Sequence, residues 1–254
     1  MEHLSEYLRE HRNSYRKVVV VPVHLYGHPC NMDLLDLIRK EYDLLIMEDC
    51  SQAHGTKYMG KHVGYLGEVS VYSLYPGKNL GALGDAGILT TDSEEYYNRA
   101  RSLRNYGSSR KYHYDELGNN HRMDTIQAIF LQEKLDLLNK WTQKKREFAE
   151  KYLSGIKNER VKLPQVSNDA YHSYHIFCIR VDDRDSFMDY MNKNGITTII
   201  HYPIPIHDTE IFEGSDEVYT SSLTDACKDQ IVSLPIHPYM DNYIQYIIDK
   251  INSW

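Results

Sequence analysis

The chain contains 254 residues with a formal net charge of −7 at pH 7, and 41% of its residues are hydrophobic and 26% charged. This composition is typical of a globular protein with a substantial core, long enough for one large domain or for a large and a small one. The acidic balance opposes general nucleic-acid binding, which requires a basic face, and no apolar run approaches the length of a membrane span.

The first part of the chain predicts a parallel sheet with covering helices. Residues 18–25 (VVVVPVHL) and 44–48 (LLIME) are apolar runs typical of strands, and residues 32–42 (MDLLDLIRKEY) repeat apolar side chains at helical spacing. Further strands are predicted at 69–73 and 87–91. Because a strand–helix–strand order is typical of α/β proteins, we expect residues 1–140 to form part of a large α/β domain.

A long helix and a smaller unit are predicted for the rest of the chain. One helical pattern runs from residue 123 to about residue 153, with apolar side chains on one side and charges on the other. After a break at LPQ (163–165), the pattern predicts strands at 175–181 and 197–202 and helices at 183–195 and 240–251. We therefore expect residues 141–254 to form a small α+β domain.

A first cluster of polar residues follows the predicted strand 44–48. In the run EDCSQAHG (48–55), Asp49 stands just beyond the carboxyl end of a strand, where open α/β sheets bind their ligands. An aspartate there can pair with a pyridinium nitrogen and keep it protonated, which makes the ring an electron sink. A helix N-cap or a turn aspartate is the structural alternative.

A second cluster is the glycine-rich stretch SLYPGKNLGALGDAG (73–87), which contains a single lysine, Lys78. Its glycines allow close approach of the backbone, and a lysine desolvated beside a cationic ring becomes a nucleophile towards carbonyls. Ser73, at the end of a predicted strand, can donate its hydroxyl to a phosphate. The stretch lacks the G-x-x-x-x-G-K-[ST] pattern of a nucleotide P-loop. A surface turn with a solvated lysine is the structural alternative.

Together these blocks resemble the DegT/DnrJ/EryC1/StrS family of pyridoxal-phosphate-dependent sugar aminotransferases of fold type I. The resemblance runs in order through VHLYGHPCNMD, EDCSQAHGTKYMGKHVGYLG, SLYPGKNLGALGDAG, LRNYG, GNNHRMDTIQAIFLQEKL, HIFCIRV, GITTIIHYPIPIH and SLPIHPYM. It covers the chain from about Val18 onward. The implied fold class is α/β and aspartate aminotransferase-like, with a mixed, mostly parallel sheet in a partial large domain and a small C-terminal α+β domain.

The resemblance implies roles for five residues around the cofactor pyridoxal 5'-phosphate. Lys78 matches the lysine that binds the cofactor covalently, and Asp49 matches the aspartate that pairs with the pyridine nitrogen. Gln52 matches a glutamine that lies against the ring, and Ser73 matches a serine that binds the phosphate. Asn120 matches an asparagine that reaches the phosphate of the neighbouring subunit, since the active sites of the family are shared across a homodimer interface.

The histidines of the run HYPIPIH (201–207) have a separate interpretation. His201 and His207 resemble a pair of metal ligands, but two intervening prolines and the lack of a third ligand at useful spacing argue against a metal site. The resemblance implies that these histidines, with Tyr202, belong to a loop on the substrate side, near the sugar or its nucleotide.

Cysteine usage and the start of the chain indicate the compartment. The four cysteines, at positions 30, 50, 178 and 227, form no Cys-x-x-Cys pair. Residues 1–6 lack the basic and apolar pattern of a secretory signal. We therefore expect a reduced, cytoplasmic protein with no structural metal and no disulfide framework.

The resemblance also implies an activity. We expect transfer of an amino group from glutamate to a keto group of a nucleotide-linked deoxysugar, with dTDP as the expected nucleotide, for cell-surface polysaccharide or glycan biosynthesis. The run YPGKNLGALGDAG (75–87) is most similar to members that aminate the 3-keto position of dTDP-6-deoxyhexoses, and 4-keto amination is the alternative.

One departure from the family pattern leaves other hypotheses open. Family members carry roughly a hundred further residues before the segment that resembles them here. That segment holds a Gly-Thr turn that binds the phosphate and an aromatic residue that stacks on the ring. A non-catalytic remnant, or half of a split enzyme that acts with a partner chain, is therefore an alternative. A nucleotide-binding oxidoreductase is a third, but no G-x-G-x-x-G follows a strand.

Overall fold

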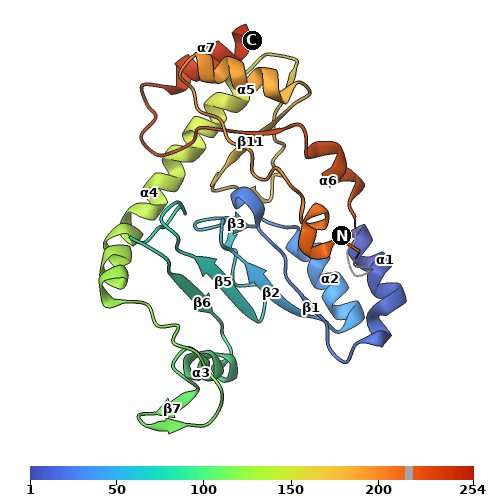
Figure 1. The fold of residues 1–254 in the computed structure, drawn as a ribbon, viewed down its shortest axis with the longest axis vertical. Coiled ribbons are helices and arrows are strands. Elements are labelled where there is room, and N and C mark those ends of the chain that lie inside the picture. The colour runs from blue at the N-terminus through green and yellow to red at the C-terminus, as the bar shows by residue number, and fades with distance from the viewer. Residues whose placement is uncertain (215–219) are drawn as a thin grey trace. The chain divides into compact units, whose positions relative to one another are not determined.

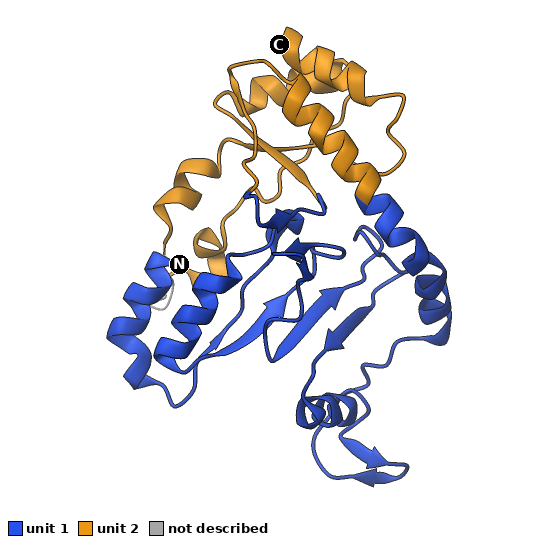
Figure 2. Ribbon diagram, turned by 180° about the vertical axis from the view of Figure 1, so that it is seen from behind, with its two compact units in different colours: residues 1–142, 167–175 blue, residues 143–166, 176–254 orange. Residues whose placement is uncertain are grey.

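The computed structural model describes residues 1–214 and 220–254, and these residues form two compact units (Figure 2). Unit 1 comprises Met1–Thr142 and Ser167–His175, and unit 2 comprises Gln143–Val166 and Ile176–Trp254. The chain thus leaves unit 1, returns to it for one short segment and leaves it again. Within the described residues, no helix combines the length and the apolar character that crossing a bilayer would require.

Unit 1 is built on a four-stranded mixed sheet in the order β1–β2–β5–β6 (Figure 1). Strands β1, β2 and β5 are parallel, and β6 is antiparallel to β5. The helices are α1 (Glu2–His11), α2 (Met32–Tyr42), α3 (Glu94–Leu103) and α4 (Thr125–Gly155), with 3-10 turns η1 (Arg12–Ser14) and η2 (Leu25–Gly27). The sheet strands are β1 (Val19–Val20), β2 (Leu45–Asp49), β5 (Val69–Ser73) and β6 (Gly87–Thr90).

Two small sheets complete unit 1. Strand β10 (Ala170–Tyr171), from the returning segment, pairs antiparallel with β3 (Lys57–Tyr58), which also pairs with β4 (Lys61–His62). A hairpin of β7 (Ser108–Arg110) and β8 (His113–Tyr114) follows α3. The pairing of β10 with β3 explains why residues distant in sequence belong to unit 1.

Helix α2 illustrates how the sequence places the sheet. It begins after Asn31, whose side chain accepts a hydrogen bond from a backbone N–H of the first turn, a common N-cap. Leu35 is fully buried in one cluster with Ile46 of β2, and Ile38 is buried in a second cluster with Leu8 of α1. The apolar spacing predicted for residues 32–42 therefore produces a helix between the sheet and α1.

Unit 2 contains a three-stranded antiparallel sheet in the order β12–β11–β9. Its strands are β9 (Val161–Lys162), β11 (Phe177–Val181) and β12 (Ile231–Leu234), and its helices beyond the second part of α4 are α5 (Arg184–Lys193), η3 (Ile206–Asp208), η4 (Glu210–Phe212), α6 (Ser222–Cys227) and α7 (Ile244–Ser253). Tyr152 of α4 lies against Phe177 of β11 (ring centroids 4.9 Å apart) and donates a hydrogen bond to Pro235 O (2.9 Å). Aromatic packing around the end of α4 thus forms part of this core.

Two predicted strands differ from the structure. The run 18–25 forms only β1 and one further bridge, Val23 to Asp49, because Pro22 has no N–H to donate to a ladder. The prediction of a strand at 197–202 is wrong, since Ile199 alone pairs there, with Ser233. Two prolines follow at 203 and 205, where a strand would have had to continue.

Candidate active site

Four of the residues predicted to bind the cofactor lie at one edge of the unit 1 sheet. Asp49 is the last residue of β2 and Ser73 the last of β5, and these parallel neighbours pair Asp49 with Val71. The carboxyl ends of β2 and β5 therefore lie side by side (Figure 1). Gln52 and Lys78 are in the loops that follow these ends, where open α/β sheets bind their ligands.

Asp49 presents a half-buried carboxylate with one oxygen engaged. Its backbone is held on both sides, since its N–H donates to Pro22 O (2.9 Å) and its carbonyl accepts from the N–H of His24 (3.1 Å). Oδ1 accepts a hydrogen bond from the N–H of Ser51 (2.9 Å). Within the described residues, Oδ2 has no hydrogen-bond partner, so it can accept a proton-bearing nitrogen of a ligand.

The residue before Asp49 fixes the end of β2. Glu48 is fully buried, and its carboxylate accepts hydrogen bonds from His24 Nε2 (3.1 Å) and from the backbone N–H groups of Gly64 (2.8 Å), Leu66 (2.7 Å) and Gly67 (2.7 Å). Burial alone would raise the pKa of Glu48, but these hydrogen bonds outweigh it and hold the pKa below its ordinary value. Glu48 is therefore a buried anion that ties the loop 64–67 to the strand.

The hydrogen bonds of His24 determine its tautomer. Nδ1 accepts from the backbone N–H of Cys30 (3.0 Å), so this nitrogen carries no proton. Nε2 must then carry the proton that it donates to Glu48. His24 is thus a neutral imidazole whose two nitrogens are both used, and the negative charge of Glu48 is balanced by hydrogen bonds without a cation.

Lys78 presents a half-buried amine beside Asp49. Its backbone N–H donates to Tyr75 O (2.9 Å) in the turn that follows β5. Burial lowers the pKa of Lys78, and the carboxylate of Asp49 opposes this change without cancelling it. Among the residues that the structure describes, Nζ has neither a hydrogen bond nor an ion pair. The amine is therefore available for chemistry and is deprotonated more easily than that of an ordinary lysine.

Ser73 and Gln52 flank these two charged groups. Ser73 Oγ accepts a long hydrogen bond from the N–H of Tyr75 (3.4 Å), which leaves its hydroxyl proton free to be donated to a phosphate. Gln52 is buried, and its Oε1 accepts from the N–H of Tyr26 (2.6 Å). The side chain of Gln52 is thus held in one orientation by the turn at residues 25–27.

Replacement of Asp49 by asparagine is expected to lower the pKa of Lys78 further, because the carboxylate that opposes the effect of burial is removed. Competitive acetylation of the protein alone, read by mass spectrometry, should therefore label Lys78 several-fold faster at pH 8 in Asp49→Asn than in the wild type. Asp36→Asn, which removes an exposed carboxylate on α2, is the control and should leave the labelling unchanged. Equal rates in wild type and Asp49→Asn would contradict the coupling.

The structure does not bring Asn120 to this edge of the sheet. Asn120 is exposed, and its strand-like bridge is to Asn105, just after α3. Its neighbours are held in the same region, since Asn119 N donates to Leu103 O (2.8 Å) and His121 N to Arg104 O (2.8 Å). The described contacts thus place Asn120 near the start of the β7–β8 hairpin.

The residues predicted on the substrate side lie in unit 2. His201 Nδ1 hydrogen-bonds Ser233 Oγ (2.8 Å), and burial lowers the pKa of His201. Tyr202 is exposed, with a fractional exposure of 52%. His207 Nε2 bonds Asp225 Oδ1 (2.9 Å).

Among the residues that the structure describes, two groups of side chains have spacings that a metal ion could use. In the group of His207, Asp208 and Asp225, the ammonium of Lys228 lies 2.6 Å from Asp208 Oδ2 and 3.5 Å from Asp225 Oδ1. A cation of the protein itself therefore already neutralises these carboxylates. This arrangement is an ion-pair cluster that joins η3 to α6.

The second group consists of His24, Glu48 and Cys50. Burial and the charge of Glu48 raise the pKa of Cys50 to about 12, so its sulfur is a thiol and not the thiolate that metals bind. Both nitrogens of His24 are already engaged. The donor set does not suit a metal.

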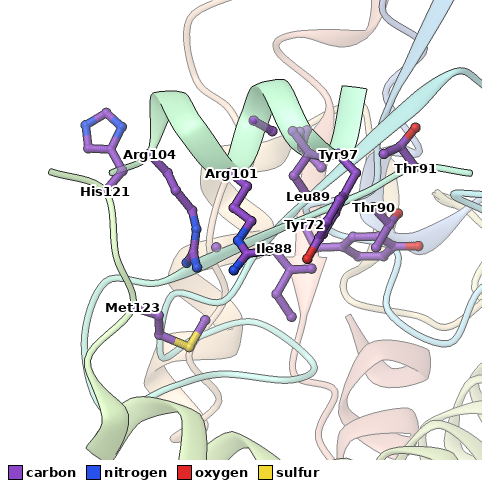
Figure 3. Close-up of a pocket in the computed structure, with 13 residues that line it drawn as sticks. Tyr72, Ile88, Leu89, Thr90, Thr91, Tyr97, Arg101, Arg104, His121 and Met123 are labelled. Atoms are coloured by element: carbon purple, nitrogen blue, oxygen red, sulfur yellow. The ribbon is translucent and has the colours of Figure 1, made fainter. Parts of the chain in front are cut away.

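A cavity of about 830 Å³ is lined by residues of β5, β6 and α3 (Figure 3). The apolar residues that line it include Ile88 and Leu89 of β6 and Met123. The guanidinium groups of Arg101 and Arg104 point into it. None of the residues predicted to bind the cofactor or the substrate is among those that line it.

Sequence reasoning missed the residues that hold the loop of Lys78. Asn79 contacts both Ser173 and His175, although more than ninety positions separate it from them. Lys134 of α4 donates to Gly81 O (2.5 Å) at the other end of the same loop. The sequence contains one signal for these residues, which is the position of Asn79 next to Lys78.

Comparison with known proteins gives a consistent result. Residues 8–252 match the model of the DegT/DnrJ/EryC1/StrS aminotransferase family. The chain is 42% identical over 247 residues to the dTDP-3-amino-3,6-dideoxy-alpha-D-galactopyranose transaminase of Aneurinibacillus thermoaerophilus, covering 96% of this chain and 68% of that protein. It is 37% identical over 242 residues to the dTDP-3-amino-3,4,6-trideoxy-alpha-D-glucose transaminase of Streptomyces venezuelae, covering 94% of this chain and 64% of that protein.

A solved structure agrees with these relatives. The crystal structure of S. venezuelae DesV in complex with a ketimine intermediate has a TM-score of 0.89 at 36% identity, and the match covers 96% of this chain and 67% of that chain. The chain therefore spans about two thirds of the length of the proteins that it resembles, and slightly less for the Streptomyces transaminase.

Proposed function

Because the chain belongs to the DegT/DnrJ/EryC1/StrS aminotransferase family, we propose that the protein transfers an amino group from glutamate to a keto group of a nucleotide-linked deoxysugar. The observation that carries the proposal is the presence of Lys78 and Asp49 together at the carboxyl edge of a parallel sheet, close enough for the carboxylate to influence the pKa of the amine. One residue supplies an unengaged amine of lowered pKa, and the other supplies an unengaged carboxylate oxygen.

The cofactor of the proposed reaction is pyridoxal 5'-phosphate, and the residues present fit it. Lys78 would hold its carbonyl carbon, Asp49 Oδ2 would accept the N–H of its ring, and Ser73 would donate to its phosphate. Gln52 would lie against the ring. When bound, the cofactor supplies an electron sink that makes the α-carbon of an amino acid acidic.

The residues of the chain then account for the proton movements. An amine with a lowered pKa gives up its proton more readily than an ordinary lysine, so Lys78 can act as the base that accepts the α-proton of glutamate and later return a proton to another atom. The negative charge of Asp49 holds a proton on the nitrogen that faces it, which stabilises charge developing in the transition state. The two side chains thus have distinct tasks: Lys78 accepts and releases a proton, whereas Asp49 keeps its negative charge throughout.

The substrate class follows from the relatives. The names of the Aneurinibacillus and Streptomyces transaminases place an amino group at carbon 3 of dTDP-linked deoxysugars. We extend this to the present chain as the 3-keto group of a dTDP-linked 6-deoxyhexose, with 4-keto amination as the alternative. His201, Tyr202 and His207 would contact the sugar or its nucleotide, and Asn120 would reach the cofactor phosphate of a second subunit in a homodimer. A cytoplasmic role in polysaccharide or glycan biosynthesis completes the proposal.

Reduction with borohydride in the presence of pyridoxal phosphate tests this function. The cofactor should become fixed to Lys78, and glutamate added beforehand should reduce the label while 2-oxoglutarate appears. Lys134 is the matched control within the same protein, since its pKa is also lowered by burial but its amine is engaged with Gly81 O. A label on Lys134, or one spread over exposed lysines, would contradict the assignment.

A further inference from the structure

The carboxamide of Asn79 connects the residue after Lys78 to two other parts of unit 1. Nδ2 donates to His54 O (3.4 Å) and to Ser173 Oγ (3.4 Å), and Oδ1 lies 3.2 Å from His175 Nδ1. A carbonyl such as His54 O can only accept, so the amide nitrogen must face it and Oδ1 must face the imidazole. His175 therefore donates its Nδ1–H to Asn79, which fixes the orientation of both side chains.

The partners of Asn79 are themselves held in place. Ser173 is fully buried, its N–H donates to Gly27 O (3.0 Å), and its Oγ lies 2.8 Å from Thr56 Oγ1. Thr56 Oγ1 also donates to Gly27 O (2.8 Å). Gly27 has φ of +89°, and a Cβ built on it would collide with Ser173 Oγ, so only glycine fits there. The segment 173–175 is thus a rigid support for Asn79.

The other end of the loop is held from α4. Lys134 Nζ donates to Gly81 O (2.5 Å), and Gln127 Oε1 accepts from the N–H of Leu83 (2.8 Å). A Cβ on Gly81 would collide with the carbonyl oxygen of Pro76, so the loop is folded closely on itself. The backbone around Lys78 is therefore held on both sides, whereas its amine has no partner among the described residues.

We propose that Asn79 and His175 are positioning residues that fix the direction in which Lys78 presents its amine to Asp49. This role rests on the proposed function. In that function Lys78 needs a backbone that is held in place and an Nζ that makes no hydrogen bond. Reactions of bound groups are sensitive to misplacement by about 1 Å. The hydrogen bond from His175 to Asn79, the residue after Lys78, prevents such misplacement and does not engage the amine of Lys78.

The test measures Lys78 in the protein without cofactor, so that it is independent of the proposed activity. Competitive acetylation across pH 7–11, read by mass spectrometry, gives the titration of Lys78. In Asn79→Ala and His175→Leu the loop should loosen and the amine should gain water, so its pKa should move back towards the ordinary value. Labelling at pH 8 should then fall by about threefold or more, since one pKa unit corresponds to a tenfold change in free amine.

A conservative variant and a matched control make the test specific. In His175→Asn the amide nitrogen takes nearly the place of Nδ1 and can still donate to Asn79, so the wild-type titration should be retained. Asn31→Ala removes the cap of α2 in the same unit and should lower stability without changing the titration of Lys78.

The outcomes separate the inference from the proposed function. Unchanged titration in both Asn79→Ala and His175→Leu, or equal changes in Asn31→Ala, would overturn the positioning role. Loss of the wild-type profile in His175→Asn would also overturn it, because the donated hydrogen bond would then not be the cause. Failure of the proposed function would instead appear as the absence of a borohydride-fixed label on wild-type Lys78.

Discussion

Glu48→Ala is expected to lower the free energy of unfolding of unit 1 by on the order of 4 kcal/mol. The reason is that five donors lose their acceptor at once: Nε2 of His24, the backbone N–H groups of Gly64, Leu66 and Gly67, and, at a longer distance, the hydroxyl of Ser70. Buried donors without a partner cost about 1–3 kcal/mol each, and water entering the space left by the side chain would recover part of that loss. Such a change is large beside a typical total stability of about 5–15 kcal/mol.

Denaturant unfolding measures this effect. Asp36→Ala on α2 is the control, because its carboxylate also forms ion pairs, with Arg39 (2.8 Å) and Lys40 (2.6 Å), but at the surface. That variant should lose less than about 1 kcal/mol. The pKa of Glu48 is lowered in the folded state, so its contribution is present above the ordinary carboxyl range and is lost as the pH falls through the folded-state pKa. A Glu48→Ala protein as stable as Asp36→Ala would refute the buried-anion account.

Lys145→Met is expected to stabilise the protein at pH 7 by up to about 4 kcal/mol. Lys145 lies in the part of α4 that belongs to unit 2, is only 6% exposed, and burial lowers its pKa to about 7. Between pH 7 and about 10.5 the unfolded chain therefore binds more protons at this residue than the folded chain, and the stability of the wild type should rise with pH. Methionine has a similar length and carries no charge to desolvate.

The adjacent residue provides the control. Lys144 is exposed and paired with Asp241 (3.0 Å), which raises its pKa, so Lys144→Met should change stability little. Unfolding free energies of wild type and Lys145→Met, compared between pH 7 and pH 10.5, should converge as the pH rises. A difference that stays constant over this range would mean that Lys145 is protonated in the folded protein at all these pH values.

The sequence predicts those parts of the fold that local physics determines. Helix 32–42 and strand 69–73 occur with the predicted bounds, because a helical repeat of apolar residues and a short apolar run each specify one structure. The family and the α/β fold of type I are confirmed by the match over residues 8–252 and by the similarity to the DesV structure. The strand predicted at 197–202 is reduced to a single bridge, from Ile199 to Ser233, and Pro203 and Pro205 follow it.

The residues of the candidate site likewise fall into those that local sequence predicts and those that it does not. Asp49 and Ser73 could be placed from sequence because both end predicted strands, and parallel strands bring their carboxyl ends to one edge. The contacts of Asn79 could not, because Ser173 and His175 lie more than ninety positions away and reach it through tertiary contacts, which include the pairing of β10 with β3. The roles of Lys78, Asp49, Gln52, Ser73 and Asn120 stay predictions for the labelling experiments to decide.

The returning segment Ser167–His175 also sets an order of assembly during synthesis. When a ribosome has released residues 1–142, Ser173, which contacts both Thr56 and Asn79, does not yet exist in the nascent chain. At typical elongation rates, roughly 2 to 7 seconds pass before His175 follows, and residues 143–166 of unit 2 emerge in between. The sheet can therefore form early from local contacts, whereas the loop of Lys78 acquires its final conformation only after part of the second unit has been made.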